Sequence, residues 1–502
     1  MGDLFSNLAI GFGVALTPLN LGFALVGCLV GTLVGVLPGI GPIATVAMLL
    51  PLTFYLEPVS GLIMLAGIFY GAQYGGSTTA ILVNMPGETS SVVTCIDGHQ
   101  MARQGRAGPA LAVAALGSFF AGCFATLLIA LFSPPLAKIG SSFGSPEYFS
   151  LMALGLIAAV VLAHGSVIKA VAMVILGLLL GLVGTDGQSG GTRFSFGLVV
   201  LSDGIGFVPL AIGVFGLGEV IANLLAPEQS RSLVDKKVTG IWPTREDFRQ
   251  AWPAVIRGTT LGSILGVLPG GGATLSSFAA YVLEKKVAKD PSRFGRGAIE
   301  GVAGPESANN AGAQTSFIPM LTLGIPGNAV MALMIGALTI HGIQPGPLVM
   351  AERPTLFWGM VASMWIGNLM LVIINLPLIG IWVQLLRVPY RLLYLSILLF
   401  CAIGVYTVNN NPFEIILTAF FGVLGYVFLR LECEPAPMLL GFVLGPLMEE
   451  HLRRAMRISS GDPMIFIERP ISLGLLIAAL ALLVIVALPH IRSKREEVFQ
   501  ES

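Results

Sequence analysis

Two related stretches, GTLVGVLPGIGPIAT at residues 31–45 and GSILGVLPGGGATLS at residues 262–276, interrupt apolar segments in the two halves of this chain. Both contain the pentapeptide GVLPG, and the copies at 35–39 and 266–270 lie 231 residues apart. A Pro-Gly pair ends or kinks a helix and leaves backbone N–H and C=O groups without helical partners. Lipid cannot satisfy those groups, so each break must face protein, water or a bound ion. The two stretches therefore predict two broken membrane helices at equivalent places.

A second Pro-Gly break follows each copy, Met85-Pro86-Gly87 in the first half and Ile325-Pro326-Gly327 in the second. These breaks lie 240 residues apart, so the second half carries a longer connection, and the charged stretch 285–296 falls within it. Because the chain has 63 Gly and 31 Pro, chance supplies one shared pentapeptide easily. Chance does not readily produce two breaks in the same order and at nearly the same separation in both halves. We therefore interpret the chain as an internal duplication. Paired interrupted segments of this kind indicate the binding site of a secondary transporter.

The composition is that of a polytopic membrane protein. Of 502 residues, 55% are hydrophobic and 11% charged, whereas soluble domains carry about 25% charged residues. Residues 4–56 and 307–351 contain no Asp, Glu, Lys or Arg, so each window holds more than one crossing or a re-entrant hairpin. We therefore predict an all-α polytopic membrane fold with about 10–12 transmembrane helices. Two repeats, inverted as is common in transporters, would each contain broken or re-entrant helical hairpins.

Apolar and charged segments divide the chain into four predicted parts. Residues 1–227 form the first repeat half, 228–253 a charged cytoplasmic linker, 254–450 the second repeat half, and 451–502 a charged amphipathic segment, a last transmembrane helix and a basic tail. The formal net charge is zero, which gives no argument for nucleic acid as a partner; the expected surroundings are a lipid bilayer.

Basic residues indicate the orientation in the membrane. They concentrate at 99–106, 231–249, 285–296 and 492–495, and the positive-inside rule predicts that these connections are cytoplasmic. One basic group conflicts with a cytoplasmic assignment of all basic segments, namely Arg453, Arg454 and Arg457. A single last span at 471–489 puts this group on the face opposite the tail. Acidic neighbours weaken the signal there, so we rely on the linker and the tail.

Small hydroxyl and amide residues gather beside the breaks. A half-helix that starts after Pro38-Gly39 or Pro269-Gly270 presents free N–H groups with partial positive charge, which favour a carboxylate. Neutral donors nearby are Ser77, Thr78, Thr79, Asn309 and Asn310, and the second stretch adds Gly271, Gly272 and Thr274. Unwound carbonyls suit a small hard cation such as sodium, with candidate positions near Gly39, Asn84, Gly270 and Asn310. The alternative is that these small residues serve close helix packing; we favour a site because the clusters accompany both breaks.

A few ionisable residues lie in apolar surroundings, where a charge at mid-bilayer costs about 2.5–3.5 kcal/mol. Glu219, in FGLGEVIANLL, is either an ion ligand or proton carrier, or a hydrogen-bonded residue near the cytoplasmic end of its helix; we prefer the structural interpretation. Glu88, Asp97 and Glu306 adjoin the polar clusters and are candidates to orient them or to steer gating.

Enzyme motifs are missing from the sequence. It contains no GxxxxGK[ST] phosphate loop, no HExxH zinc motif and no CxxCH haem site. We therefore expect no enzymatic activity and no cofactor, apart from a coupling cation, sodium or a proton.

Four stretches closely resemble the large membrane subunit, TctA type, of the tripartite tricarboxylate transporters: GVLPGIGPIATVAMLLPLTF (35–54), YGGSTTAILVNMPGETSSVVTCIDGHQMARQGRAGPAL (74–111), GVFGLGEV (213–220) and GPESANNAGAQTSFIPMLTLGIPG (304–327). The resemblance implies a secondary transporter of the bacterial inner membrane that imports citrate-like tricarboxylates or related carboxylates with a cation gradient, commonly of sodium. It implies two partners, a periplasmic solute-binding protein (TctC type) and a small four-helix membrane subunit (TctB type). Similarity to other anion transporters with paired hairpins further implies an elevator-like movement.

The family motifs fall on residues of both halves. In the first half they match Pro38, Gly39, Gly41, Ser77, Thr78, Thr79, Asn84, Pro86 and Gly87; in the second half they match Pro269, Gly270, Ser307, Asn309, Asn310, Pro326 and Gly327. We predict that these residues, together with Gly271, Gly272 and Thr274, line one substrate site at the membrane midplane. The alternative functions are a passive anion channel and a receptor-like membrane subunit that transports nothing.

Overall fold

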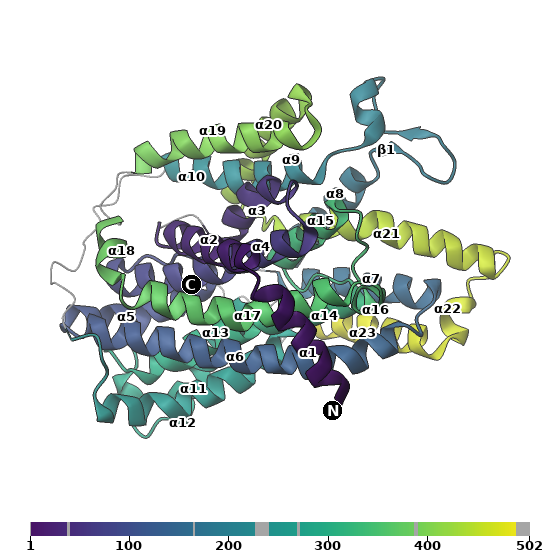
Figure 1. Cartoon of the computed structure of the whole chain (residues 1–502). Helices are drawn as coiled ribbons and strands as arrows, with labels where there is room; N and C mark the ends of the chain where they lie inside the picture. Colours follow the sequence, from purple (N-terminus) through teal and green to yellow (C-terminus); the bar gives the residue numbers. More distant parts are fainter. Residues whose placement is uncertain are drawn as a thin grey trace.

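Helices make up nearly the whole structure, a computed structural model that describes residues 2–37, 41–163, 166–225, 240–268, 272–385 and 390–487 (Figure 1). Among these residues the one sheet is a two-stranded antiparallel hairpin. Five described helices are long and apolar enough to cross a membrane: Pro18–Gly35, Ala107–Gly140, Phe207–Leu225, Pro354–Asn375 and Pro412–Arg430. The prediction of an all-α polytopic membrane fold is confirmed.

The first half of the chain contains the following elements: α1 (Gly2–Ala15), α2 (Pro18–Gly35), α3 (Pro42–Thr53), α4 (Pro58–Val83), the 3-10 turn η1 (Thr89–Ser91), α5 (Val92–Arg103), α6 (Ala107–Gly140), α7 (Ser145–Leu162), α8 (Val167–Gly181), β1 (Gly184–Thr185), β2 (Thr192–Arg193), η2 (Val199–Asp203), α9 (Phe207–Ala211), the π-helical segment η3 (Ile212–Leu217) and α10 (Gly218–Leu225).

The second half contains α11 (Arg245–Gly266), α12 (Gly272–Val287), η4 (Pro291–Arg293), α13 (Glu300–Thr315), α14 (Phe317–Leu323), α15 (Ala329–Ile340), α16 (Pro347–Glu352), α17 (Pro354–Asn375), α18 (Ile379–Leu385), α19 (Tyr390–Asn409), α20 (Pro412–Arg430), α21 (Ala436–Ile458), α22 (Ile465–Glu468) and α23 (Pro470–Ala487).

Each half contains one pair of parallel helices in which glycines allow two backbones to touch. The glycines are Gly27, Gly31 and Gly35 in α2, and Gly258, Gly262 and Gly266 in α11. They face, in order, Met64, Ile68 and Ala72 of α4, and Gly304, Ala308 and Gly312 of α13. A Cβ atom on any of these glycines would lie 2.2 or 2.3 Å from the facing backbone carbonyl oxygen, far inside van der Waals contact. The same helix pair therefore occurs twice, in the same register.

The second breaks of the two halves also share their backbone conformation. Helix α4 ends at Asn84 (φ 57°), and α14 ends at Gly324 (φ 73°), both in the left-handed region. After Pro-Gly, Glu88 and Asn328 are both extended and both cap the helical segment that follows, with φ values of −151° and −157°. Matching conformations at positions 240 residues apart support the interpretation of an internal duplication.

The two copies run in opposite directions. Gly61, in the first turns of α4, lies against Thr53 and against His341, which follows α15. Conversely, the segment that leads into α13 binds Asp97 of α5, the helix that follows α4. The start of α4 thus lies beside the segment that follows α13, α14 and α15. The start of α13 lies beside α5, which follows α4, so α4 and α13 are antiparallel. The hairpins α2–α3 and α11–α12 therefore enter from opposite ends of the molecule, as predicted for inverted repeats.

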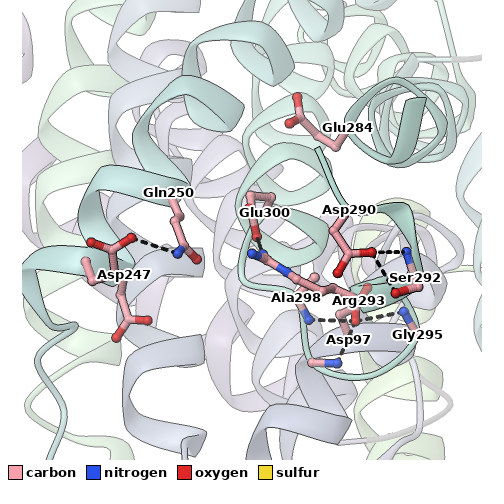
Figure 2. Close-up of polar contacts among 12 residues, drawn as sticks. Asp97, Asp247, Gln250, Glu284, Asp290, Ser292, Arg293, Gly295, Ala298 and Glu300 are labelled. Atoms are coloured by element: carbon pink, nitrogen blue, oxygen red, sulfur yellow. Dashed lines mark hydrogen bonds and ion pairs between the residues drawn. The ribbon is translucent and has the colours of Figure 1, made fainter. Parts of the chain in front are cut away.

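Three of the basic connections predicted to be cytoplasmic meet at one end of the molecule. Asp97 is fully buried, and its Oδ1 accepts hydrogen bonds from the backbone N–H groups of Gly295, Gly297 and Ala298 at 2.8–2.9 Å (Figure 2). Arg106, after α5, forms an ion pair with Asp247 at the start of α11. The stretch 99–106, the end of the linker and the stretch 285–296 therefore share one face.

The arginines of α21 lie at the other end, next to the β1–β2 hairpin (Figure 1). Arg453 binds Asp186 at 3.0 Å, and Arg193 binds the same carboxylate at 2.6 Å. Hydrogen bonds from Ser189 and the backbone of Gln188, together with these two guanidinium groups, hold the pKa of Asp186 well below its usual range. Two of these arginines, Arg453 and Arg454, are paired with carboxylates, which weakens the topological signal of this group.

Candidate functional site

Two fully buried helices cross at the centre of the molecule. Every residue from Ser60 to Val83 in α4, and every residue from Gly301 to Thr315 in α13, is buried. The ring of Tyr70 lies 6.0 Å from that of Phe317, which begins α14. Both helices are rich in glycine and alanine, and small side chains let backbones approach closely in membranes. The polar residues of both halves are therefore forced together where the helices cross.

Glu306 of α13 is the central polar residue of this crossing. Its side chain is 1% exposed. Ser77 of α4 donates its hydroxyl proton to Glu306 Oε2 at 2.6 Å, and Thr94 of α5 donates to Oε1. Among the described residues, no Lys, Arg or His forms an ion pair with this carboxylate. Two donors from the first half thus hold an acidic group from the second half.

Asn310, one turn further along α13, extends this network to α6. Its Nδ2 donates to Ser118 Oγ at 2.7 Å and to the backbone carbonyl of Glu306 at 3.1 Å. Ser118 lies in α6, which also packs against α13 and α11. The sequence prediction included Asn310 but not Ser118.

A small cavity of about 10 Å³ lies at the crossing, lined on its polar side by Tyr74, Ser77, Thr78, Ser118, Glu306 and Asn375. That volume holds about one water molecule. Asn375, the last residue of α17, is 4% exposed, and its Oδ1 has no hydrogen-bond partner in the described part of the chain. Its Nδ2 donates to the backbone of Leu371 at 2.9 Å. The cavity therefore combines a carboxylate, hydroxyl groups and an unused amide oxygen.

A second polar contact joins the segment after Pro86-Gly87 to the second half. Asn309 Nδ2 donates to Glu88 Oε1 at 3.0 Å, and Ser90 also donates to this oxygen. Asn309 is fully buried, whereas Glu88 is partly exposed. The hydroxyls of Thr89 and Thr274 lie 3.1 Å apart. These contacts bring the start of α12 beside the segment that follows Pro86-Gly87.

Other predicted residues lie on the same helices but bind backbone groups. Thr79 donates to the carbonyls of Val36 and Gly75 at 2.9 and 3.1 Å, which ties α4 to the end of α2. Ser307 donates to the carbonyl of Ala303 at 2.8 Å, and Thr78, although it lines the cavity, donates to that of Tyr74 at 3.1 Å. Their hydroxyl oxygens remain able to accept, so their role as ligands stays a prediction.

The break residues are not gathered at the cavity. Asn84 and Pro86 are exposed, and Gly87 packs against Gly76 of α4. Pro326 and Gly327 are buried. A ligand role for Asn84 or for these break residues therefore remains a prediction.

The tips of the two hairpins are described only in part. Gly41 caps α3 and Gly272 begins α12, so a half-helix starts at each predicted place. Glu219 of α10 lies beside the backbone of Gly41, and both interpretations of Glu219 stay predictions. Five predicted residues lie outside the described residues, namely Pro38, Gly39, Pro269, Gly270 and Gly271. The cation positions predicted near Gly39 and Gly270 are therefore untested.

Sequence reasoning missed three residues of the crossing, Thr94, Ser118 and Asn375. One signal was available for Asn375, because α17 is otherwise apolar and carries Asn368 and Asn375 seven residues apart, on one helix face. Thr94 and Ser118 lie among other small residues, and nothing local marks them.

Comparison with known proteins gives the family. The model of the "Tripartite tricarboxylate transporter TctA family" matches residues 21–440. An "uncharacterized 52.8 kDa protein in TAR-I ttuC' 3'region" of Agrobacterium vitis is 62% identical over 501 residues, which is all of both chains. A second Agrobacterium vitis protein, described as lying in the TAR-II ttuC' 3'region, is 62% identical over 240 residues, 48% of this chain and 99% of its own length. No solved structure matches. Because the family model covers most of the chain, the protein belongs to the tripartite tricarboxylate transporter TctA family.

Proposed function

We propose that this protein is the transporting membrane subunit of a carboxylate importer that is coupled to a cation gradient. It would lie in the bacterial inner membrane and work with a small four-helix subunit of the TctB type. A periplasmic binding protein of the TctC type would deliver a citrate-like tricarboxylate or a related carboxylate. Membership of the TctA family supports this assembly.

One observation carries the proposal: the polar residues of two oppositely oriented hairpin units meet at one buried point. Ser77 and Thr94 of the first half bind Glu306 of the second half, and Asn309 of the second half binds Glu88 of the first. In secondary transporters with inverted repeats, the substrate and ion sites lie at the interface between the repeats near the midplane. The crossing lies between the two inverted units, which supports the proposal that it is such a site.

The size of the cavity favours a carrier over a passive channel. At the crossing it is only about 10 Å³, about the size of one water molecule. A carboxylate the size of citrate needs more room, so substrate entry requires the hairpins to move apart. We propose an elevator-like movement, in which the glycine-packed units α2–α4 and α11–α13 shift against the surrounding helices.

The available donors suit a carboxylate. The amide of Asn310 and the hydroxyl of Ser118, which bind each other in this structure, would turn to a bound carboxylate, and the starts of α3 and α12 carry the partial positive charge of helix N-termini. No guanidinium or ammonium group lines the cavity within the described residues. The substrate would therefore be held by dipoles, and its charge balanced by a cation that travels with it.

Counterflow in proteoliposomes tests the proposal. Purified protein, reconstituted with the small subunit, would be loaded with unlabelled carboxylate, and uptake of labelled carboxylate delivered by the cognate binding protein would be measured. A carrier accumulates label transiently above its external concentration, whereas a channel or a receptor does not. The variant Asn310→Ala should lose most of this uptake. Thr126→Ala is the control, because the buried hydroxyl of Thr126, on the neighbouring helix α6, donates to its own helix, to the carbonyl of Gly122 at 2.7 Å.

A further inference from the structure

We propose that Glu306, Ser77 and Asn375 surround the binding site of the coupling cation, a sodium ion or a proton. This inference rests on the transport function proposed above and names the part of the central site that would carry coupling. It places the cation at the crossing of α4, α13 and α17, away from the break residues that the sequence indicated.

The first reason is the state of the Glu306 carboxylate. It is 1% exposed and accepts hydrogen bonds from two hydroxyl groups, those of Ser77 and Thr94. No ion pair to it occurs within the described residues. A buried charge without a partner is strongly unfavourable, so such a group binds a cation or takes up a proton. The two hydroxyl donors lower the free-energy cost of burying this carboxylate, but they do not neutralise its charge.

The second reason is an independent ligand on another helix. Asn375 is 4% exposed and lines the same cavity, and its Oδ1 lacks a hydrogen-bond partner in the described structure. Its Nδ2 donates to the carbonyl of Leu371 and to Thr32 Oγ1, so the amide oxygen is the polar atom of this side chain that remains free. A buried polar oxygen without a protein partner calls for an explanation such as a bound water or ion.

The third reason is the match between the ligands and the size of the cavity. Carboxylate, hydroxyl and amide oxygens are the ligands that hard cations prefer. The space of about 10 Å³ is about that of one water molecule, so it suits a bare monovalent ion and excludes a tricarboxylate. The cation and the carboxylate would therefore occupy neighbouring positions, not the same one.

Among the described residues, the titratable groups near Glu306 add no positive charge. They are Tyr74 of α4, Cys95 of α5 and Glu88 after Pro86-Gly87. Because Glu88 is a second carboxylate nearby, an anionic substrate is repelled more strongly when no cation occupies the cavity. A cation on Glu306 removes this repulsion, so cation binding would raise the affinity for the carboxylate, and the substrate would raise the affinity for the cation by the same factor.

Binding of ²²Na⁺ to the full-length protein in nanodiscs, without substrate, provides the test. Wild type and the buried-carboxylate control Glu414→Gln should bind sodium saturably at alkaline pH. Glu306→Gln, Glu306→Asp and Asn375→Ala should bind it at least about tenfold more weakly. If a proton is the cation, no variant binds ²²Na⁺; instead, wild type takes up a proton when substrate binds, measured with a pH indicator, and Glu306→Gln does not.

The outcomes separate this inference from the proposed function. If wild type shows counterflow while Glu306→Gln and Asn375→Ala keep wild-type cation dependence, the cation site is wrong and the transporter stands. If ²²Na⁺ binding or proton uptake depends on Glu306 but no carboxylate gives counterflow, the site stands and the transport proposal fails. Asn375→Ala keeps the test decisive if the Glu306 variants do not fold, because it removes a ligand without leaving a buried charge unpaired.

Discussion

Ser77 Oγ lies 2.6 Å from Glu306 Oε2, although the two residues are separated by 229 positions and belong to opposite halves of the chain. Ser77 also donates within α4 to the carbonyl of Gln73 at 3.0 Å, so its proton is shared between the local helix and the distant carboxylate. This contact is where the two inverted units meet most directly at the buried crossing.

Replacement of Ser77 by alanine should therefore weaken coupling without unfolding the protein. A hydrogen bond to a buried charged group that is lost costs about 1–3 kcal/mol, or a factor of about 5–150 in an equilibrium constant. We expect the apparent affinity for both cation and carboxylate to fall within that range in counterflow. Thr126→Ala should remain at wild-type values. Wild-type affinity and cation dependence in Ser77→Ala would remove this contact from the mechanism.

The glycine contacts of α2 should be essential for stability. In Gly31→Ala the new Cβ would lie 2.3 Å from the carbonyl oxygen of Ile68, which is backbone and cannot give way. Overpacking of this kind costs about 1–3 kcal/mol, so we expect a clearly lower melting temperature in detergent by fluorescence-detected size exclusion. Gly22→Ala, in the same helix, meets no atom within 4 Å and should leave the melting temperature unchanged or slightly raised. Equal melting temperatures for the two variants would contradict the helix packing described here.

The same contact should recur in the second half. In Gly262→Ala the Cβ would lie 2.3 Å from the carbonyl oxygen of Ala308, so its melting temperature should fall by an amount similar to that of Gly31→Ala. A loss in only one of the two variants would mean that the repeats do not share this packing.

Much of the architecture could be predicted from the sequence because its signals are local. Pro-Gly pairs, left-handed caps and glycines spaced four apart each act within one or two helical turns, and they mark both copies of the duplicated unit. Ser77 and Asn310 were identified for the same reason, since each stands in a polar cluster beside a break. The domain boundaries themselves stay predictions.

The partners of these residues could not be predicted, because they depend on how distant helices cross. That Ser77 binds Glu306, and that Asn375 of α17 lines the same cavity, follows from the antiparallel placement of α4 and α13. The unequal burial of the two breaks has a similar origin. Leu323 and Ile325 pack against Gly140 of α6 and Gly155 of α7, whereas Asn84 remains exposed.

Asp97 should hold the longer connection of the second half in place. Its Oδ1 accepts three backbone hydrogen bonds from that connection, and its Oδ2 accepts one from the hydroxyl of Tyr281 at 2.9 Å. Asp97→Ala leaves these donors without a partner, at a cost of about 1–3 kcal/mol or more. We expect faster proteolysis at residues 288–299 in inside-out vesicles.

The control for Asp97 is Asp290→Ala in the same connection. Its carboxylate binds only the nearby Ser292 among the described residues, so its removal should leave the cleavage rate close to that of wild type. Equal cleavage of Asp97→Ala and wild type would show that the buried aspartate does not anchor the connection.

The two charged ends of the molecule should face opposite sides of the membrane. The end that contains Arg106 and Asp247 joins three basic connections, which the positive-inside rule assigns to the cytoplasm. The arginines of α21 lie at the other end beside the β1–β2 hairpin, where Arg457 is bound by the side chain of Gln188 at 2.8 Å (Figure 1).

In a variant without the five native cysteines, Arg457→Cys should react with an impermeant maleimide added to intact spheroplasts, and Arg245→Cys should react only after the membrane is opened. Gly187→Cys, in the β1–β2 turn, has open space around it and should label like Arg457→Cys. Labelling of Arg245→Cys from outside would invert the whole topology, and labelling of both sites from one side would contradict their placement at opposite ends of the molecule.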